Sequence, residues 1–172
     1  MSHLKGLANL GVAINPSFLG DWPMKIGLYM LNFAAIELIS YQYLDALEKT
    51  REDFNKNLDK LLSARIKRIL ELLSDSPLIE NSHKDEIKSL WETAKELAIW
   101  RNRIAHNPVL PTWKPGSDSE KDPPDLIGIL DMRQLKTSNI SDSISLEGIH
   151  MLINKTFDVG NQLHAAAKYL KK

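Results

Sequence analysis

The sequence predicts an all-α domain, an up-and-down four-helix bundle with a small β-ribbon or irregular insert before the last helix. Apolar residues recur at helical spacing in four segments, and no segment predicts a sheet large enough to form a core. Glycine and proline, which interrupt helices, gather at the start of the chain and ahead of the last segment. With 172 residues, 43% of them hydrophobic, the chain has the size and core content of one domain.

The first predicted helix runs from residue 24 to about residue 49 and opens a helical domain that spans residues 24–172. It is apolar on almost every side, which predicts that neighbouring helices bury it. Residues 1–23 are rich in glycine and proline and carry few charges, so we expect an irregular N-terminal arm there.

The second predicted helix begins after Thr50, which forms a capping-box pattern with Asp53. We expect it to continue as one helix to about Ser74, because apolar residues recur at helical spacing throughout. Pro77 then separates it from the third helix. The apolar stripe of the second helix consists of Phe54, Leu58, Leu61, Leu62, Ile69, Leu72 and Leu73.

Residues 107–125 are rich in proline and predict an exposed loop between the third helix and the last one. Short strands are expected at residues 109–113, 126–131 and 133–137, as a small ribbon beside the bundle. Ser145 is a good N-cap for the last helix, whose apolar residues follow at helical spacing.

Composition and charge exclude several classes of protein. The chain has no cysteine, which excludes a disulfide framework and thiolate catalysis. Its 22 basic and 22 acidic side chains balance, so no overall field draws the chain onto nucleic acid or an anionic membrane. No apolar run approaches the roughly 18 to 20 residues of a membrane span, and no signal peptide is recognised, so we expect a cytoplasmic protein without membrane contact. Since no histidines or acids show metal-ligand spacing, we expect no metal and no cofactor.

Arg101 occupies an unusual position on the third helix, which we expect to run from about Ser82 to His106. At about 100° per residue, Arg101 lies near the centre of the apolar stripe, where an arginine needs a partner. Glu37, an acid in the middle of the first helix, is the expected partner. Asn102 and His106 are four residues apart and share a stripe beside Arg101. The histidine falls in the last turn, where free carbonyls favour an imidazolium. Arg101, Asn102 and His106 therefore form the candidate site.

Residues 100–108, which read W-R-N-R-I-A-H-N-P, resemble the R-x4-6-H motif of HEPN domains, often written R-N-x-x-x-H. In that family the motif lies at the end of the third bundle helix, and the predicted helix order resembles the family over most of residues 24–172. Many HEPN proteins are metal-independent endoribonucleases in which two subunits join their motifs in one cleft. The resemblance therefore implies a homodimer that cleaves RNA as a toxin or antiviral defence component, with a protein antitoxin as a further partner.

The resemblance also implies a role for each motif residue. His106 acts as general acid or base on the RNA 2'-OH or the leaving 5'-oxygen, and Arg101 stabilises the charge that grows on the phosphorane. Asn102 orients the histidine or the phosphate, while Glu37 supports the arginine. The products are a 2',3'-cyclic phosphate and a free 5'-OH. The residues beside the motif that we expect to bind substrate are Trp100, Arg103, Asn107 and Trp113.

Two other interpretations use the same residues. In one, the chain is a non-catalytic helical module that binds a nucleotide, a nucleic acid or a protein partner through the same cleft. In the other, Arg101 and Glu37 form a structural ion pair, while His106 and Asn107 only end the helix. The second helix also carries basic residues, which acidic neighbours dilute and which we expect to form a solvated face. These basic residues are Lys56, Lys60, Arg65, Lys67 and Arg68.

Overall fold

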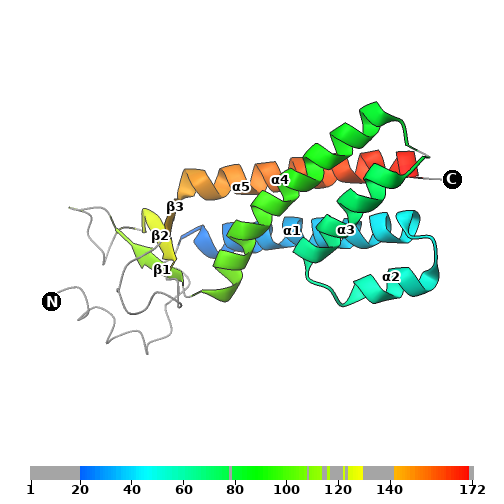
Figure 1. The fold of residues 1–172 in the computed structure, drawn as a ribbon. Helices are drawn as coiled ribbons and strands as arrows, with labels where there is room; N and C mark the ends of the chain where they lie inside the picture. Colours follow the sequence, from blue (N-terminus) through cyan, green and yellow to red (C-terminus); the bar gives the residue numbers. More distant parts are fainter. Residues whose placement is uncertain are drawn as a thin grey trace.

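The chain is mainly helical, as the apolar periodicity predicts (Figure 1). The computed structural model describes residues 20–77, 79–107, 109–113, 116, 122, 124–129 and 142–170. Its helices are α1 (Trp22–Leu47), α2 (Arg51–Leu58), α3 (Leu62–Asp75), α4 (Asn81–His106), α5 (Leu146–Ala166) and the short 3-10 helix η4 (Ala167–Leu170). Its strands are β1 (Val109–Thr112), β2 (Leu126–Ile129) and β3 (Asp142–Ser145). Most of the expected N-terminal arm lies outside the described residues, and α1 begins two residues earlier than predicted.

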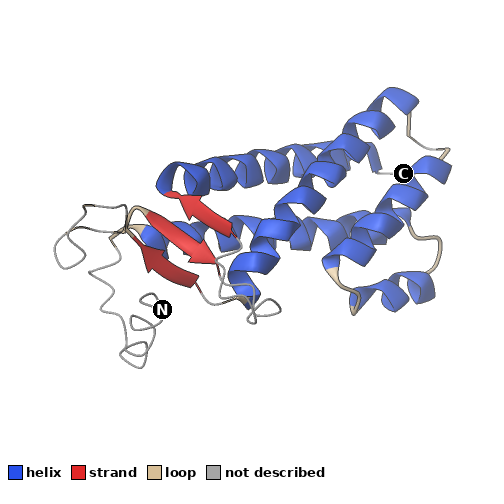
Figure 2. Cartoon of the chain, turned by 60° about the vertical axis from the view of Figure 1, so that its left-hand side comes forward, coloured by secondary structure: helices blue, strands red, loops and turns tan. Residues whose placement is uncertain are grey.

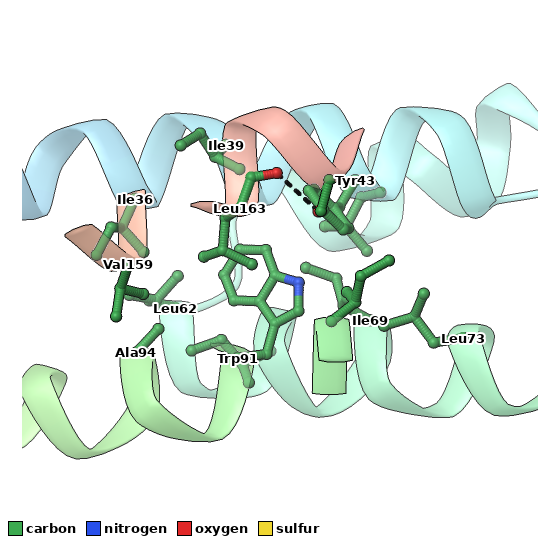
Figure 3. Close-up of a cluster of buried hydrophobic side chains, with 14 of the residues drawn as sticks. Ile36, Ile39, Tyr43, Leu62, Ile69, Leu73, Trp91, Ala94, Val159 and Leu163 are labelled. Carbon is green, nitrogen blue, oxygen red and sulfur yellow. Dashed lines mark hydrogen bonds between the residues drawn. The ribbon is translucent and has the colours of Figure 1, made fainter. Parts of the chain in front are cut away.

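Helices α1, α3, α4 and α5 all contribute to one large apolar core. Trp91 of α4 is completely buried in it, and its ring meets the ring of Tyr43 in α1 edge-on, with 5.2 Å between the centroids (Figure 3). The Tyr43 hydroxyl donates a 2.8 Å hydrogen bond to the backbone carbonyl of Leu163 in α5. This bond satisfies a polar group that burial has removed from water, so one tyrosine connects α1, α4 and α5.

A second apolar cluster lies where the three-stranded sheet meets the start of α1, the end of α4 and the start of α5 (Figure 2). The sheet is antiparallel, in the order β1-β2-β3. The Trp22 indole N–H donates a 3.1 Å hydrogen bond to the carbonyl of Pro124. Because Ile104 is part of this cluster, the last turn of α4 is held in place, and His106 with it. The buried members are Trp22, Tyr29, Ile104, Ile127, Ile129, Ile144, Ile149 and Ile153.

The short strands were predicted in part. β1 and β2 lie within the segments 109–113 and 126–131, where strands were expected. The third expected strand, 133–137, lies outside the described residues. β3 was not expected, because its four residues alternate too briefly to stand out from the helix that follows. Ser145 does cap α5, since its hydroxyl accepts a 3.0 Å hydrogen bond from the backbone N–H of Gly148.

The prediction of one continuous helix over residues 50–74 was wrong, because the chain breaks there into α2 and α3. The side-chain amide of Asn57 donates to the Glu48 carboxylate at 3.0 Å and to the backbone carbonyl of Asp53 at 2.8 Å. Asparagine often interrupts helices through such bonds to nearby groups. Leu61, which the pattern placed on the buried stripe, has an extended backbone and is 80% exposed. The break lets α3 pack against both α1 and α4.

The expectation that α1 is buried on almost every side was also wrong. Met24, Leu28, Leu31 and Leu38 lie on one stripe of the helix and are all exposed. The opposite side supplies the core, because α3, α4 and α5 pack there and leave the stripe uncovered in the single chain. Of the helices in the described part of the chain, none combines the length and the apolar composition that crossing a bilayer requires.

The buried phenols of Tyr29 and Tyr43 predict a loss of stability at alkaline pH. Burial raises the pKa of each phenol above its ordinary value of about 10. The unfolded chain therefore ionises first, so the contribution of the neutral phenols is complete below about pH 10 and is lost as the pH rises further. We expect the free energy of unfolding, measured by urea denaturation, to fall above about pH 10 by up to about 1.4 kcal/mol per pH unit for each phenol.

A double variant, Tyr29→Phe with Tyr43→Phe, provides the control for this prediction. Each of the two substitutions removes a hydrogen bond to a backbone carbonyl, so the double variant is less stable at neutral pH. Its stability should nevertheless depend less on pH between about pH 9 and about pH 11. If the free energy of unfolding falls equally steeply with pH in the double variant and in the natural chain, groups other than these phenols cause the loss of stability.

Candidate functional site

A pocket opens between α1, the start of α3 and the last turns of α4. Its volume is about 460 Å³, within the range of roughly 300 to 1,000 Å³ that is typical of small-molecule sites. All three motif residues line it, together with the expected partner of the arginine. The polar lining residues are Glu37, Lys60, Ser63, Arg65, Arg101, Asn102 and His106.

The ion pair expected between Arg101 and Glu37 is present. The Arg101 Nη2 and Glu37 Oε1 atoms are 3.2 Å apart, and about a quarter to a third of each side chain is exposed, 27% and 29%. Arg101 Nη1 also donates a 3.0 Å hydrogen bond to the side-chain oxygen of Asn102. The guanidinium carbon lies 5.9 Å from the centroid of the Phe33 ring. The arginine is thus held by a carboxylate, an amide and a ring, yet it still reaches solvent.

His106 is the last residue of α4 and is exposed at the rim of the pocket. The task of ending the helix belongs to Asn107, whose side-chain amide and backbone N–H both donate to the carbonyl of Arg103, at 2.9 and 3.2 Å. Since Asn107 caps the helix, the imidazole of His106 is not used for that purpose. An exposed imidazole that lines the same pocket as a guanidinium is suited to proton transfer.

The four residues expected to bind substrate beside the motif do not line the pocket. Trp100 packs against the second apolar cluster, and the guanidinium carbon of Arg103 lies 5.3 Å from the centroid of its ring. The indole N–H of Trp113 donates a 2.8 Å hydrogen bond to the carbonyl of Asp122. Asn107 caps α4. In the single chain these side chains therefore serve local packing and capping beside the site.

The solvated face expected on the second helix does not include Arg65, so that part of the prediction was wrong. Arg65 is only 3% exposed, and its guanidinium carbon lies 3.9 Å from the centroid of the Tyr41 ring. A signal for this was available, because Arg65 lies three residues after Leu62 and four before Ile69 and thus falls on the apolar stripe of α3. Together with Lys60 it brings positive charge into the pocket.

The charges that line the pocket favour an anion. Lys60, Arg65 and Arg101 are cationic, whereas Glu37 is the one acid among the described residues of the lining, and Arg101 already pairs with it. A larger pocket, of about 700 Å³, lies around the ends of α1 and α3. There Arg68 is already engaged, since its guanidinium donates twice to Glu48, at 2.8 and 2.9 Å.

Among the residues that the structure describes, no three histidine or acidic side chains gather in a way that could hold a metal ion. Comparison with known proteins found no matching family model, no similar curated protein and no similar solved structure.

The pairing of Glu37 with Arg101 can be measured by a double-mutant cycle. Glu37→Gln keeps the size of its side chain, Arg101→Gln shortens its side chain, and the double variant removes both charges. Because both side chains are partly exposed, we expect a coupling free energy of about 0.5 to 1 kcal/mol from urea denaturation. Additive effects of the two substitutions, with no coupling, would show that Glu37 does not hold the arginine in solution.

Proposed function

We propose that this chain is a HEPN-type, metal-independent endoribonuclease whose active site is the pocket at the end of α4. The observation that carries the proposal is that Arg101, Asn102 and His106, the polar residues of the R-N-x-x-x-H pattern, line one pocket. The packing of α1, α3, α4 and α5 around a common core supports a HEPN-like four-helix bundle, with α2 as an additional short helix.

The proposed reaction is an in-line transfer within the RNA. The 2'-oxygen attacks the adjacent phosphorus as the 2'-OH proton leaves, and the bond from phosphorus to the 5'-oxygen breaks as that oxygen gains a proton. His106 is the proton-transfer group, and the guanidinium of Arg101 stabilises the charge on the equatorial oxygens of the phosphorane. The ion pair with Glu37 holds the planar guanidinium in place, which is what a preorganised phosphate clamp requires.

A homodimer fits this chemistry, because one subunit supplies a single motif histidine whereas the reaction moves two protons. Two exposed apolar side chains support an interface beside the pocket. Leu61 is 80% exposed at the pocket itself, and Ile99 is 53% exposed on the stripe of α4 that carries Asn102 and His106. A second copy that covers these side chains would bring two motifs together in one cleft.

His106→Ala is the direct test of catalysis. A labelled RNA incubated with the natural protein in the presence of EDTA should yield fragments with 2',3'-cyclic phosphate and 5'-OH ends. Since general acid and base catalysis contributes about 10²- to 10⁴-fold, His106→Ala should lower kcat by at least about 100-fold without changing the fold. His150→Ala, which replaces an exposed histidine on α5, is the matched control and should cut normally.

The same assay separates the proposal from its alternative. RNA or nucleotide binding that Arg101→Ala weakens, with no turnover by the natural protein, would favour the non-catalytic binding module. Cutting that persists in the His106→Ala protein would contradict the role of His106 and point to a contaminating nuclease.

The dimer is tested by placing a charge on the expected interface. We expect the natural protein to sediment as a dimer and Ile99→Asp to sediment as a monomer, because a buried unpaired carboxylate is strongly unfavourable at an interface. The rate of RNA cleavage should fall as the dimer dissociates. Met151→Asp changes a similarly exposed apolar residue on α5 and should leave the dimer intact. Dissociation by Met151→Asp alone would place the interface on another face.

A further inference from the structure

Arg65 lies in an environment that ordinarily excludes a charged group. It is 3% exposed, and two of its three guanidinium nitrogens, Nε and Nη1, are fully buried without any hydrogen-bond partner. Within the described residues it has no carboxylate partner; its close contact is the face of the Tyr41 ring, at 3.9 Å. A ring face attracts a cation but accepts none of the hydrogen bonds that a guanidinium offers. The charge is therefore left largely uncompensated.

Other arginines of the chain do not share this condition. Arg51, Arg68 and Arg101 have carboxylate oxygens at 2.7, 2.8 and 3.2 Å, respectively. Each of these side chains is also far more exposed than Arg65. The most deeply buried of these guanidiniums is thus the one without an anion. A buried charge of this kind is retained at a cost in stability, which an anion in the pocket that Arg65 lines would offset.

The surroundings of Arg65 add further groups that favour an anion. Arg65 lines the same pocket as Arg101, and Lys60 is also part of the lining. The first turn of α3 also faces this pocket through Leu61, Leu62 and Ser63. That turn has no side-chain cap and no acidic residue. Its free N–H groups carry the partial positive charge of a helix N-terminus.

We propose that the Arg65 side of the pocket binds a phosphate group, held by the Arg65 guanidinium, Lys60 and the first turn of α3. A phosphate can accept from several donors at once, and arginine matches its oxygens better than a lysine does. In the nucleic-acid chain, this phosphate would lie next to the phosphate on which Arg101 and His106 act. This assignment rests on the proposed function. The phosphate site itself rests only on the pocket.

Thermal unfolding of the full chain tests the site. Inorganic phosphate, sodium acetate at equal ionic strength, and a DNA dinucleotide, which has one phosphodiester and no 2'-OH, are the probes. We expect phosphate and the dinucleotide to raise Tm, by roughly 5 to 10 °C at about 100 times Kd, and acetate to have little effect. A response to phosphate but not to the dinucleotide would support a site for a free or terminal phosphate.

Arg65→Met provides the decisive comparison, and Arg51→Met is its matched control. Arg51 also stacks on a ring, with 4.4 Å from its guanidinium carbon to the Phe54 centroid, but it lies outside the pocket. We expect Arg65→Met to lose the response to phosphate and to have a Tm without phosphate at least equal to that of the natural chain, because it removes an uncompensated charge. Arg51→Met should keep the full response, which also controls for the general stabilising effect of phosphate salts.

Several outcomes would overturn the phosphate site. These are an equal response to acetate, no response of the natural chain to either phosphate probe, or an Arg65→Met protein with reduced Tm and an unchanged phosphate response. The last result would make Arg65 a packing partner of Tyr41. If Arg65→Met does not fold, Arg65→Lys replaces it, and phosphorus NMR titration should show phosphate binding weakened by at least about 10-fold.

The kinetics distinguish a failure of this site from a failure of the nuclease proposal. With an active natural enzyme, Arg65→Met should raise KM by about 10-fold or more and change kcat little, since Arg65 holds a phosphate that does not react. An active Arg65→Met enzyme with unchanged KM would contradict the phosphate site and leave the nuclease proposal intact. If phosphate binding depends on Arg65 but the protein cuts no RNA, the nuclease proposal is contradicted and the phosphate site stands.

Discussion

A guanidinium on the apolar stripe of a helix costs stability unless an anion or water meets it, and this constraint shapes the centre of the molecule. Two of the helices that build the core carry such a residue, Arg65 on α3 and Arg101 on α4. Both line the same pocket, where the apolar packing gives way to a cavity of about 460 Å³. The pocket is therefore located where the core-facing side chains stop being apolar.

The two arginines meet the constraint in different ways. Arg101 has Glu37 at 3.2 Å and remains partly exposed, so it has a fixed position and still reaches a ligand. Arg65 has the ring of Tyr41 and no carboxylate among the described residues. Together with Lys60 they make one side of the molecule attractive to anions, although basic and acidic residues balance over the whole chain. A local field of this kind is consistent with a phosphate-bearing ligand.

The sheet contributes to the site indirectly. Its isoleucines pack with Trp22 and Ile104, and through them they connect the start of α1 to the end of α4. His106 is two residues beyond Ile104, and Asn107 closes the helix with bonds to the carbonyl of Arg103. The last turn of α4 is thus secured on one side, while its other side remains open to the pocket. Such support from packed elements fixes the position of the side chains at the end of α4.

Helical periodicity and capping residues determined much of the secondary structure. The extent of α4, the cap at Ser145, the first two strands and the pairing of Arg101 with Glu37 were all predictable, because each depends on local spacing or on the need of one buried charge for a partner. The same 3.6-residue repeat puts Asn102 and His106 about 40° apart on one stripe of α4, with Arg101 about 100° from Asn102 on the adjoining face.

Only the tertiary structure decided the break between α2 and α3, the exposure of one side of α1 and the contact of Arg65 with the Tyr41 ring. These features depend on contacts outside the local helical pattern, such as Asn57 with Glu48, nine residues earlier, and α3 with α1 and α4. An apolar stripe indicates that one side of a helix is buried, but it does not indicate which neighbour packs on that side or where the contact ends. Long-range packing decides both, and for this reason the cationic pocket became visible only in the folded chain.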